Sequence, residues 1–121
     1  MSVSQTAFTL IVVVGITSGQ VLFKLAADSI SSGGIVQMLR ELAVSPYFLA
    51  AILIYGGMTA LWISVLQNAS LSHAYPLFAL TFLLVPIFSA LFLSESLNTA
   101  TMIGSVLIVS GIIVATTNAT A

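Results

Sequence analysis

Charged side chains are scarce in this 121-residue chain, which carries two Lys and Arg together and three Asp and Glu. In a water-soluble domain about a quarter of the residues are charged, and they cover the surface. Here the charged residues make up 4% of the chain, whereas 60% of the residues are hydrophobic. The composition therefore excludes a soluble globular domain and predicts an integral membrane protein.

Other absences restrict the chemistry. The chain has no Cys, which excludes disulfides, thiolate metal sites and a cysteine nucleophile. Two cationic side chains cannot neutralise a phosphate backbone, so nucleic acid is not expected as a partner. The single His, His73, has no acid near it in the sequence. We therefore expect no metal site, no cofactor and no enzymatic activity.

The apolar residues form long continuous runs. A helix needs roughly 20 mostly apolar residues to cross a hydrocarbon core of about 30 Å, whereas barrel strands alternate in polarity. The sequence predicts an all-α membrane protein, with a single domain over residues 1–121 and four transmembrane helices in a bundle. We expect the spans at residues 6–27, 46–67, 73–94 and 99–115. Because residues 1–8 contain no Lys or Arg, the first run is expected to be a retained span and not a signal peptide.

The connection between the first two spans contains a short amphipathic segment. Its apolar residues recur at helical spacing, and its polar residues face away from them: Ile35, Met38, Leu39 and Leu42 against Gln37, Arg40 and Glu41. This pattern predicts a helix that lies at the level of the lipid headgroups. An extended loop is the alternative.

Glycine and proline indicate local features of the spans. Gly15 and Gly19, four residues apart, favour close approach of a neighbouring helix. The Gly56-Gly57 pair indicates a close contact or a bend. Pro86 lies inside the third apolar run and should kink it, because proline removes a backbone hydrogen bond. Glu95 precedes the fourth span and is expected to cap its first turn.

A polar stripe ends the first span. Thr17, Gln20, Lys24 and Asp28 fall on one face of a helix. Lys24 and Asp28 are spaced to form an ion pair. An ionisable residue inside a span is a functional candidate, and the Lys24 ammonium would suit a phosphate, with Gln20 as a hydrogen-bonding partner. In the alternative interpretation, Lys24 reaches past the span end into the headgroups.

The later spans carry two other patterns. Tyr55, Thr59 and Trp62 form a stripe that suits either packing or ligand contact. Gly104 and Gly111, seven apart, share a face as a helix dimerisation seam requires. Four spans make a bundle too small to enclose a polar path, so we expect two copies or two paralogues to assemble.

Four segments carry a resemblance to a known family: Ser18–Lys24, Leu61–Gln67, Ala74–Pro76 and Phe92–Leu97. Together they resemble the four-span members of the drug/metabolite transporter superfamily. The closest pattern is that of the subunits that flip aminoarabinose-phosphoundecaprenol, more than that of the small multidrug resistance pumps. The resemblance implies a dimer, either an antiparallel homodimer or a heterodimer with a paralogous four-span chain.

The pumps supply a further comparison. They use a carboxylate in the middle of the first span for proton exchange, and the alignment of the motifs puts Ile16 at that position. The same resemblance implies that Tyr55, Tyr75 and Phe78 surround a substrate. We therefore expect a substrate cavity that lacks the carboxylate of the pumps.

These patterns predict a subunit of a multi-pass flippase or transporter in the bacterial inner membrane. Its substrate would be an anionic polyprenyl-phosphate-linked sugar whose tail stays among the membrane lipids. The expected substrate-binding residues are Gln20, Lys24, Arg40, Tyr55, Thr59, Trp62, Tyr75 and Phe78. The alternatives are an exporter of small metabolites or cations, and a membrane scaffold or accessory subunit that transports nothing.

Overall fold

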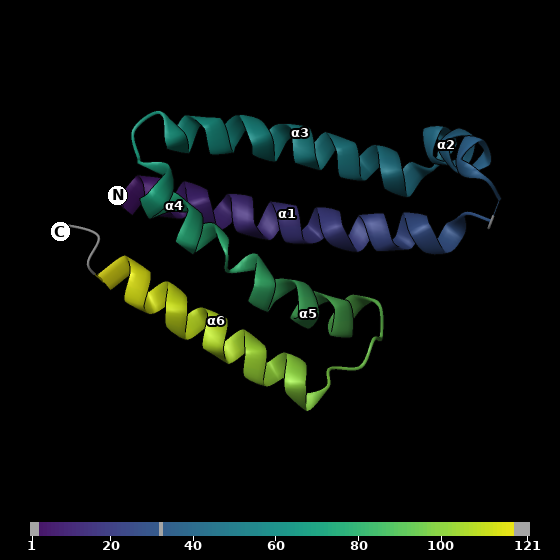
Figure 1. Ribbon diagram of the computed structural model, residues 1–121. Helices are drawn as coiled ribbons and strands as arrows, with labels where there is room; N and C mark the ends of the chain where they lie inside the picture. Colours follow the sequence, from purple (N-terminus) through teal and green to yellow (C-terminus); the bar gives the residue numbers. More distant parts are fainter. Residues whose placement is uncertain (1–2, 32, 118–121) are drawn as a thin grey trace.

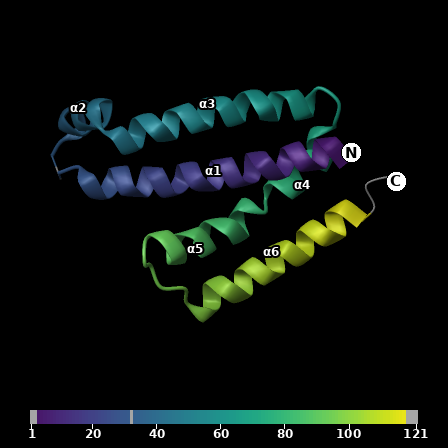
Figure 2. The same cartoon turned by 180° about the vertical axis from the view of Figure 1, so that it is seen from behind.

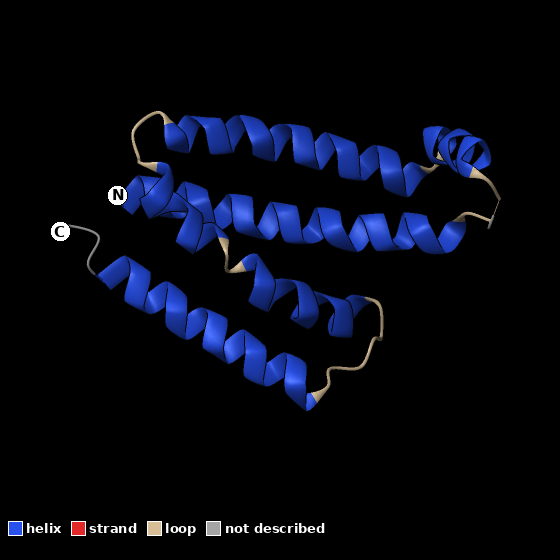
Figure 3. Cartoon of the chain, in the orientation of Figure 1, coloured by secondary structure: helices blue, strands red, loops and turns tan. Residues whose placement is uncertain are grey.

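A computed structural model describes residues 3–31 and 33–117 of the chain. Within these residues the regular structure is entirely helical (Figure 3). The helices are α1 (Val3–Ser29), α2 (Ile35–Val44), α3 (Pro46–Leu66), α4 (Leu71–Phe78), α5 (Thr81–Phe92) and α6 (Thr99–Thr117). Four segments, α1, α3, α4 with α5, and α6, are long and apolar enough to cross a membrane. The predicted all-α fold with four spans and a short helix between the first two is confirmed.

Large apolar side chains cover the outside of the bundle. Leu53 and Leu91 are 77% and 70% exposed, and the buried core consists mainly of small residues such as Val12, Val13 and Ala51. In water this distribution would be unstable, but in a bilayer the lipid tails are as apolar as leucine. The outer surface is therefore that of an integral, multi-pass membrane protein.

The helices α1 and α3 form the most extensive pair and run side by side in opposite directions (Figures 1 and 2). A Cβ atom added to Gly15 would overlap Met58, and one added to Gly19 would overlap the ring of Tyr55. The close approach predicted at these two glycines is confirmed. Of the close contact or bend indicated at Gly56-Gly57, the close contact is absent in the single chain, because an added Cβ would meet nothing within 4 Å at either residue.

The short helix α2 lies across the end of the α1–α3 pair (Figure 1). Glu41 accepts hydrogen bonds from the backbone N–H of Ser31 at 3.0 Å and from its hydroxyl at 2.8 Å. Gln37 donates to the same hydroxyl at 2.9 Å. These bonds fasten α2 to the end of α1, while Ile35 and Leu39 stay exposed. The predicted amphipathic helix is present, and the extended alternative is wrong.

The third span is interrupted at Ala79–Leu80 and not at Pro86, which lies within α5. Figure 1 shows the change of direction between α4 and α5. Around the interruption, backbone N–H groups reach three residues back, as in a 3₁₀ turn, and Leu80 donates to Leu77 at 3.1 Å. The sequence indicated a kink in this span, but the tightened turn lies nearer its N-terminal end.

The link to the last helix also differs from expectation. Asn98 caps α6, because its Oδ1 accepts a hydrogen bond from the Thr101 N–H at 2.7 Å. Glu95 lies three residues earlier, and its own N–H donates to the Ser89 carbonyl. The expected role of Glu95 as the cap was wrong, because the helix begins at Thr99 and leaves the Glu95 carboxylate outside the first turn.

Candidate functional site

A groove of about 400 Å³ lies between α1 and the interrupted third span. Its lining comes from both sides of this contact: Ile16, Gln20, Phe78, Thr81, Phe82, Val85 and Pro86. Ile16 is the middle residue of α1, and Thr81 is at the middle of the Leu71–Phe92 span. Gln20 follows Ile16 by one turn, a rise of about 6 Å. The groove is therefore near the middle of the membrane-spanning region.

Gln20 is held by a partner on α3. Its amide Nε2 donates a hydrogen bond to the phenol oxygen of Tyr55. The Tyr55 ring packs against Phe23, with ring centroids 5.0 Å apart, and contacts the backbone at Gly19. Because the amide nitrogen is engaged by Tyr55, the amide oxygen Oε1 is left to accept hydrogen bonds from a ligand.

Three aromatic residues predicted as site residues form one cluster. The ring of Phe78 lies 5.0 Å from that of Trp62 and 5.5 Å from that of Tyr75. Of these, Phe78 lines the groove, and Trp62 and Tyr75 contact the Phe78 ring without lining the groove themselves. The structure thus brings together five of the predicted residues: Gln20, Tyr55, Trp62, Tyr75 and Phe78.

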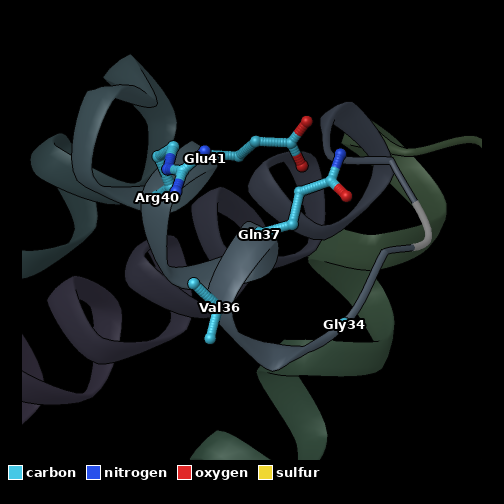
Figure 4. Close-up of a pocket in the computed structure, with 5 residues that line it drawn as sticks. All are labelled: Gly34, Val36, Gln37, Arg40 and Glu41. Carbon is cyan, nitrogen blue, oxygen red and sulfur yellow. The ribbon is translucent and has the colours of Figure 1, made fainter.

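The cations predicted to bind substrate lie outside the groove. Lys24 forms the predicted ion pair with Asp28, and its Nζ lies 3.2 Å from the Asp28 Oδ1. The two side chains are 50% and 59% exposed. Arg40 is on α2 and lines a separate surface cavity of about 460 Å³ (Figure 4). Both cations are at the end of the bundle where α1 finishes. Thr59 is exposed on α3, and its hydroxyl makes no hydrogen bond within the described residues.

Sequence reasoning missed most of the groove wall. Thr81, Phe82 and Val85 were not singled out, while Pro86 was noted only for its kink and Ile16 only for the acid it replaces. A hydroxyl at the centre of an apolar span was the signal available at Thr81. No pattern in the sequence shows that this residue faces Gln20.

The proposed dimerisation face on α6 is open in the single chain. An added Cβ at Gly104 or Gly111 would meet nothing within 4 Å. The main contacts of α6 are with α4 and α5, so it lies at the edge of the bundle (Figure 1). Its use as a seam stays a prediction.

The groove is chemically neutral. Among the described residues that line it, Gln20 and Thr81 carry hydrogen-bonding side chains and none is ionisable. Within residues 3–31 and 33–117 no three His, Asp or Glu side chains gather as a metal site would require. Such a groove can bind an uncharged ligand with both polar and apolar parts, but it offers no group for proton exchange.

Comparison with known proteins gives a consistent family. Residues 1–117 match the EamA-like transporter family. The chain is 33% identical over 96 residues to the probable 4-amino-4-deoxy-L-arabinose-phosphoundecaprenol flippase subunit ArnE of Sodalis glossinidius, covering 78% of this chain and 81% of that protein. It is 36% identical over 67 residues to the protein of the same description from Aeromonas salmonicida, covering 55% of this chain and 59% of the relative.

No solved structure matches the chain. The family match extends over all four spans, including the two that form the groove. The chain belongs to the EamA-like transporter family, and it is an integral, multi-pass membrane protein of that family.

Proposed function

We propose that this chain is one subunit of a dimeric flippase that moves a polyprenyl-phosphate-linked sugar across the bacterial inner membrane. Membership of a transporter family supports movement of a solute or lipid. Both relatives are described as probable flippase subunits for a sugar on phosphoundecaprenol, which supports this class of cargo.

The observation that carries the proposal is the separation of neutral and cationic groups along α1. Gln20 stands in a neutral groove at mid-depth, and Lys24 lies one turn nearer the end of the helix. The cargo has a matching order of parts, because an anionic phosphate joins the sugar to an apolar tail. Lys24 and Arg40 bind the phosphate at the membrane surface, and the sugar enters the groove. A cation exporter fits less well, since Ile16 supplies no carboxylate.

A second chain completes the path. The groove is only partly enclosed by this small bundle, and a sugar inside it would face lipid unless another protein surface covered it. The exposed face of α6 around Gly104 and Gly111 accommodates a close helix contact. The partner is a second copy or a paralogous four-span chain.

Transfer of a labelled lipid tests the proposal directly. Liposomes containing the full chain, alone or copurified with a paralogous four-span chain, are loaded with a polyprenyl-phosphate sugar. Membrane-impermeant periodate then oxidises the sugars that reach the outer leaflet. We expect faster oxidation than in protein-free liposomes. If neither preparation exceeds the protein-free rate, the proposed function is wrong.

Substitutions of Lys24 and of its ion-pair partner Asp28 should change the rate of lipid transfer in opposite directions. Replacement of Lys24 by Ala should lower transfer about fivefold at low salt, because one cation near an anionic headgroup contributes about 1 kcal/mol. Asp28→Asn should raise transfer, since it frees Lys24 from the ion pair. Both effects should shrink at high salt. Lys24→Arg, which retains the charge, is the control, and equal rates for Lys24→Ala and wild type would remove Lys24 from the site.

A further inference from the structure

The backbone hydrogen bonding of the third span is irregular around its interruption. A helical N–H normally bonds to the carbonyl four residues earlier, but Phe82 donates to Ala79, three residues back, at 2.9 Å. Pro86 has no N–H, so the Phe82 carbonyl lacks its usual donor.

This irregular stretch of backbone is near the middle of the membrane. Unpaired backbone groups in hydrocarbon are costly, and irregular backbone at this depth is tolerated where it lines a polar cavity or is buried in protein. Phe78, Thr81, Phe82 and Pro86 all line the groove opposite Gln20. The interruption and the groove are therefore parts of one site.

The side chain of Thr81 adds an independent observation. Some threonines of the helices bond to the carbonyl four residues back, as Thr9 does to Gln5 at 2.8 Å and Thr17 to Val13 at 2.7 Å. For Thr81 that carbonyl belongs to Leu77, which accepts from the Leu80 N–H at 3.1 Å. The Thr81 hydroxyl makes no hydrogen bond in the described part of the chain and is left for a ligand in the groove.

We infer that the groove binds an uncharged, hydroxyl-rich ring through Gln20 Oε1, the Thr81 hydroxyl and the Phe82 carbonyl near the interruption of the third span. A sugar hydroxyl both donates and accepts, which suits this mixture of two acceptors and a hydroxyl. The apolar faces of the ring pack on Phe78 and Phe82. The inference rests on the proposed function and specifies which part of the cargo the groove recognises: the hydroxyl groups and not the phosphate.

Trp62 provides the readout. It is the single Trp of the chain, and its ring lies 5.0 Å from that of Phe78 in the groove wall. Trp fluorescence of the full chain in nanodiscs is titrated with hexyl glucoside, hexanol and hexyltrimethylammonium, each below its micelle concentration. We expect hexyl glucoside to bind about tenfold more tightly than hexanol, as two neutral hydrogen bonds would give. Equal affinities, or tighter binding of the ammonium, would overturn the inference.

Variants test whether the preference for hexyl glucoside over hexanol depends on the residues at the interruption. Thr81→Val retains the shape of the side chain without the hydroxyl and should reduce the preference for glucoside about threefold. Thr116→Val is the matched control, because the Thr116 hydroxyl already bonds to Ile112 at 2.9 Å within α6. Pro86→Ala gives the Phe82 carbonyl a possible donor and should also weaken the preference. Wild-type selectivity in Thr81→Val would contradict the assignment.

The binding and transfer experiments can fail separately. If the protein binds hexyl glucoside selectively but does not transfer the polyprenyl-phosphate sugar, the binding site is supported and the proposed function is refuted. The opposite failure is also possible. If the wild type and Thr81→Val transfer the lipid at the same rate, and hexanol and hexyl glucoside bind equally, the binding site is refuted but the proposed function is not.

Discussion

Replacement of Gln20 by Met should lower the rate of lipid-linked sugar transfer by about 10- to 100-fold. Met has nearly the same length, but it removes the amide oxygen, which has no partner among the described residues, and the Nε2 donor that bonds to Tyr55. A polar group that loses its partner away from water costs about 1–3 kcal/mol, which corresponds to roughly 5- to 150-fold in rate. The periodate assay in liposomes measures the change.

Tyr55→Phe separates orientation from direct contact. This variant leaves the Gln20 amide in place and retains the ring that packs on Phe23, but it removes the oxygen that holds Nε2. Transfer should fall by a smaller factor than in Gln20→Met, about threefold to tenfold, because the amide can still turn toward the cargo. If Gln20→Met transfers lipid at the wild-type rate, Gln20 does not contact the cargo.

Replacement of Gly19 by Ala should destabilise the protein even though alanine favours helices. The added methyl group would lie 2.7 Å from Tyr55 Cδ2, so the ring or the whole of α3 must shift. Overpacking of this kind costs about 1–3 kcal/mol, more than the roughly 1 kcal/mol that Ala gains over Gly in a helix. Transfer should fall as well, since the displaced ring is the one that positions Gln20.

Gly57→Ala is the matched control for this experiment. The same methyl group at Gly57 meets nothing within 4 Å, so only the gain in helix propensity remains. Denaturant titration in detergent should therefore show lower stability for Gly19→Ala and equal or higher stability for Gly57→Ala. If the two substitutions changed the stability in the same direction and by the same amount, the α1–α3 contact would not be tight at Gly19.

Several features of the site were predictable from the residues. The polar stripe of α1 indicated Gln20, and the glycines before it indicated a close neighbour, which is Tyr55 on α3. The stripe also indicated the Lys24–Asp28 ion pair, which forms within α1, and the role of Lys24 in binding substrate stays a prediction. Helical spacing shows which residues share a face, but it does not show what that face meets.

The sequence by itself determined that four apolar helices cross a membrane and that a short amphipathic helix joins the first two. Span length, hydropathy and periodicity are properties of one segment, and they suffice because a helix satisfies its own backbone hydrogen bonds. The tertiary structure alone decided that Gln20 faces Thr81 and that the third span breaks at Ala79–Leu80. Both depend on how separate helices pack, and many pairings of apolar faces are nearly equal in energy when lipid is the alternative neighbour.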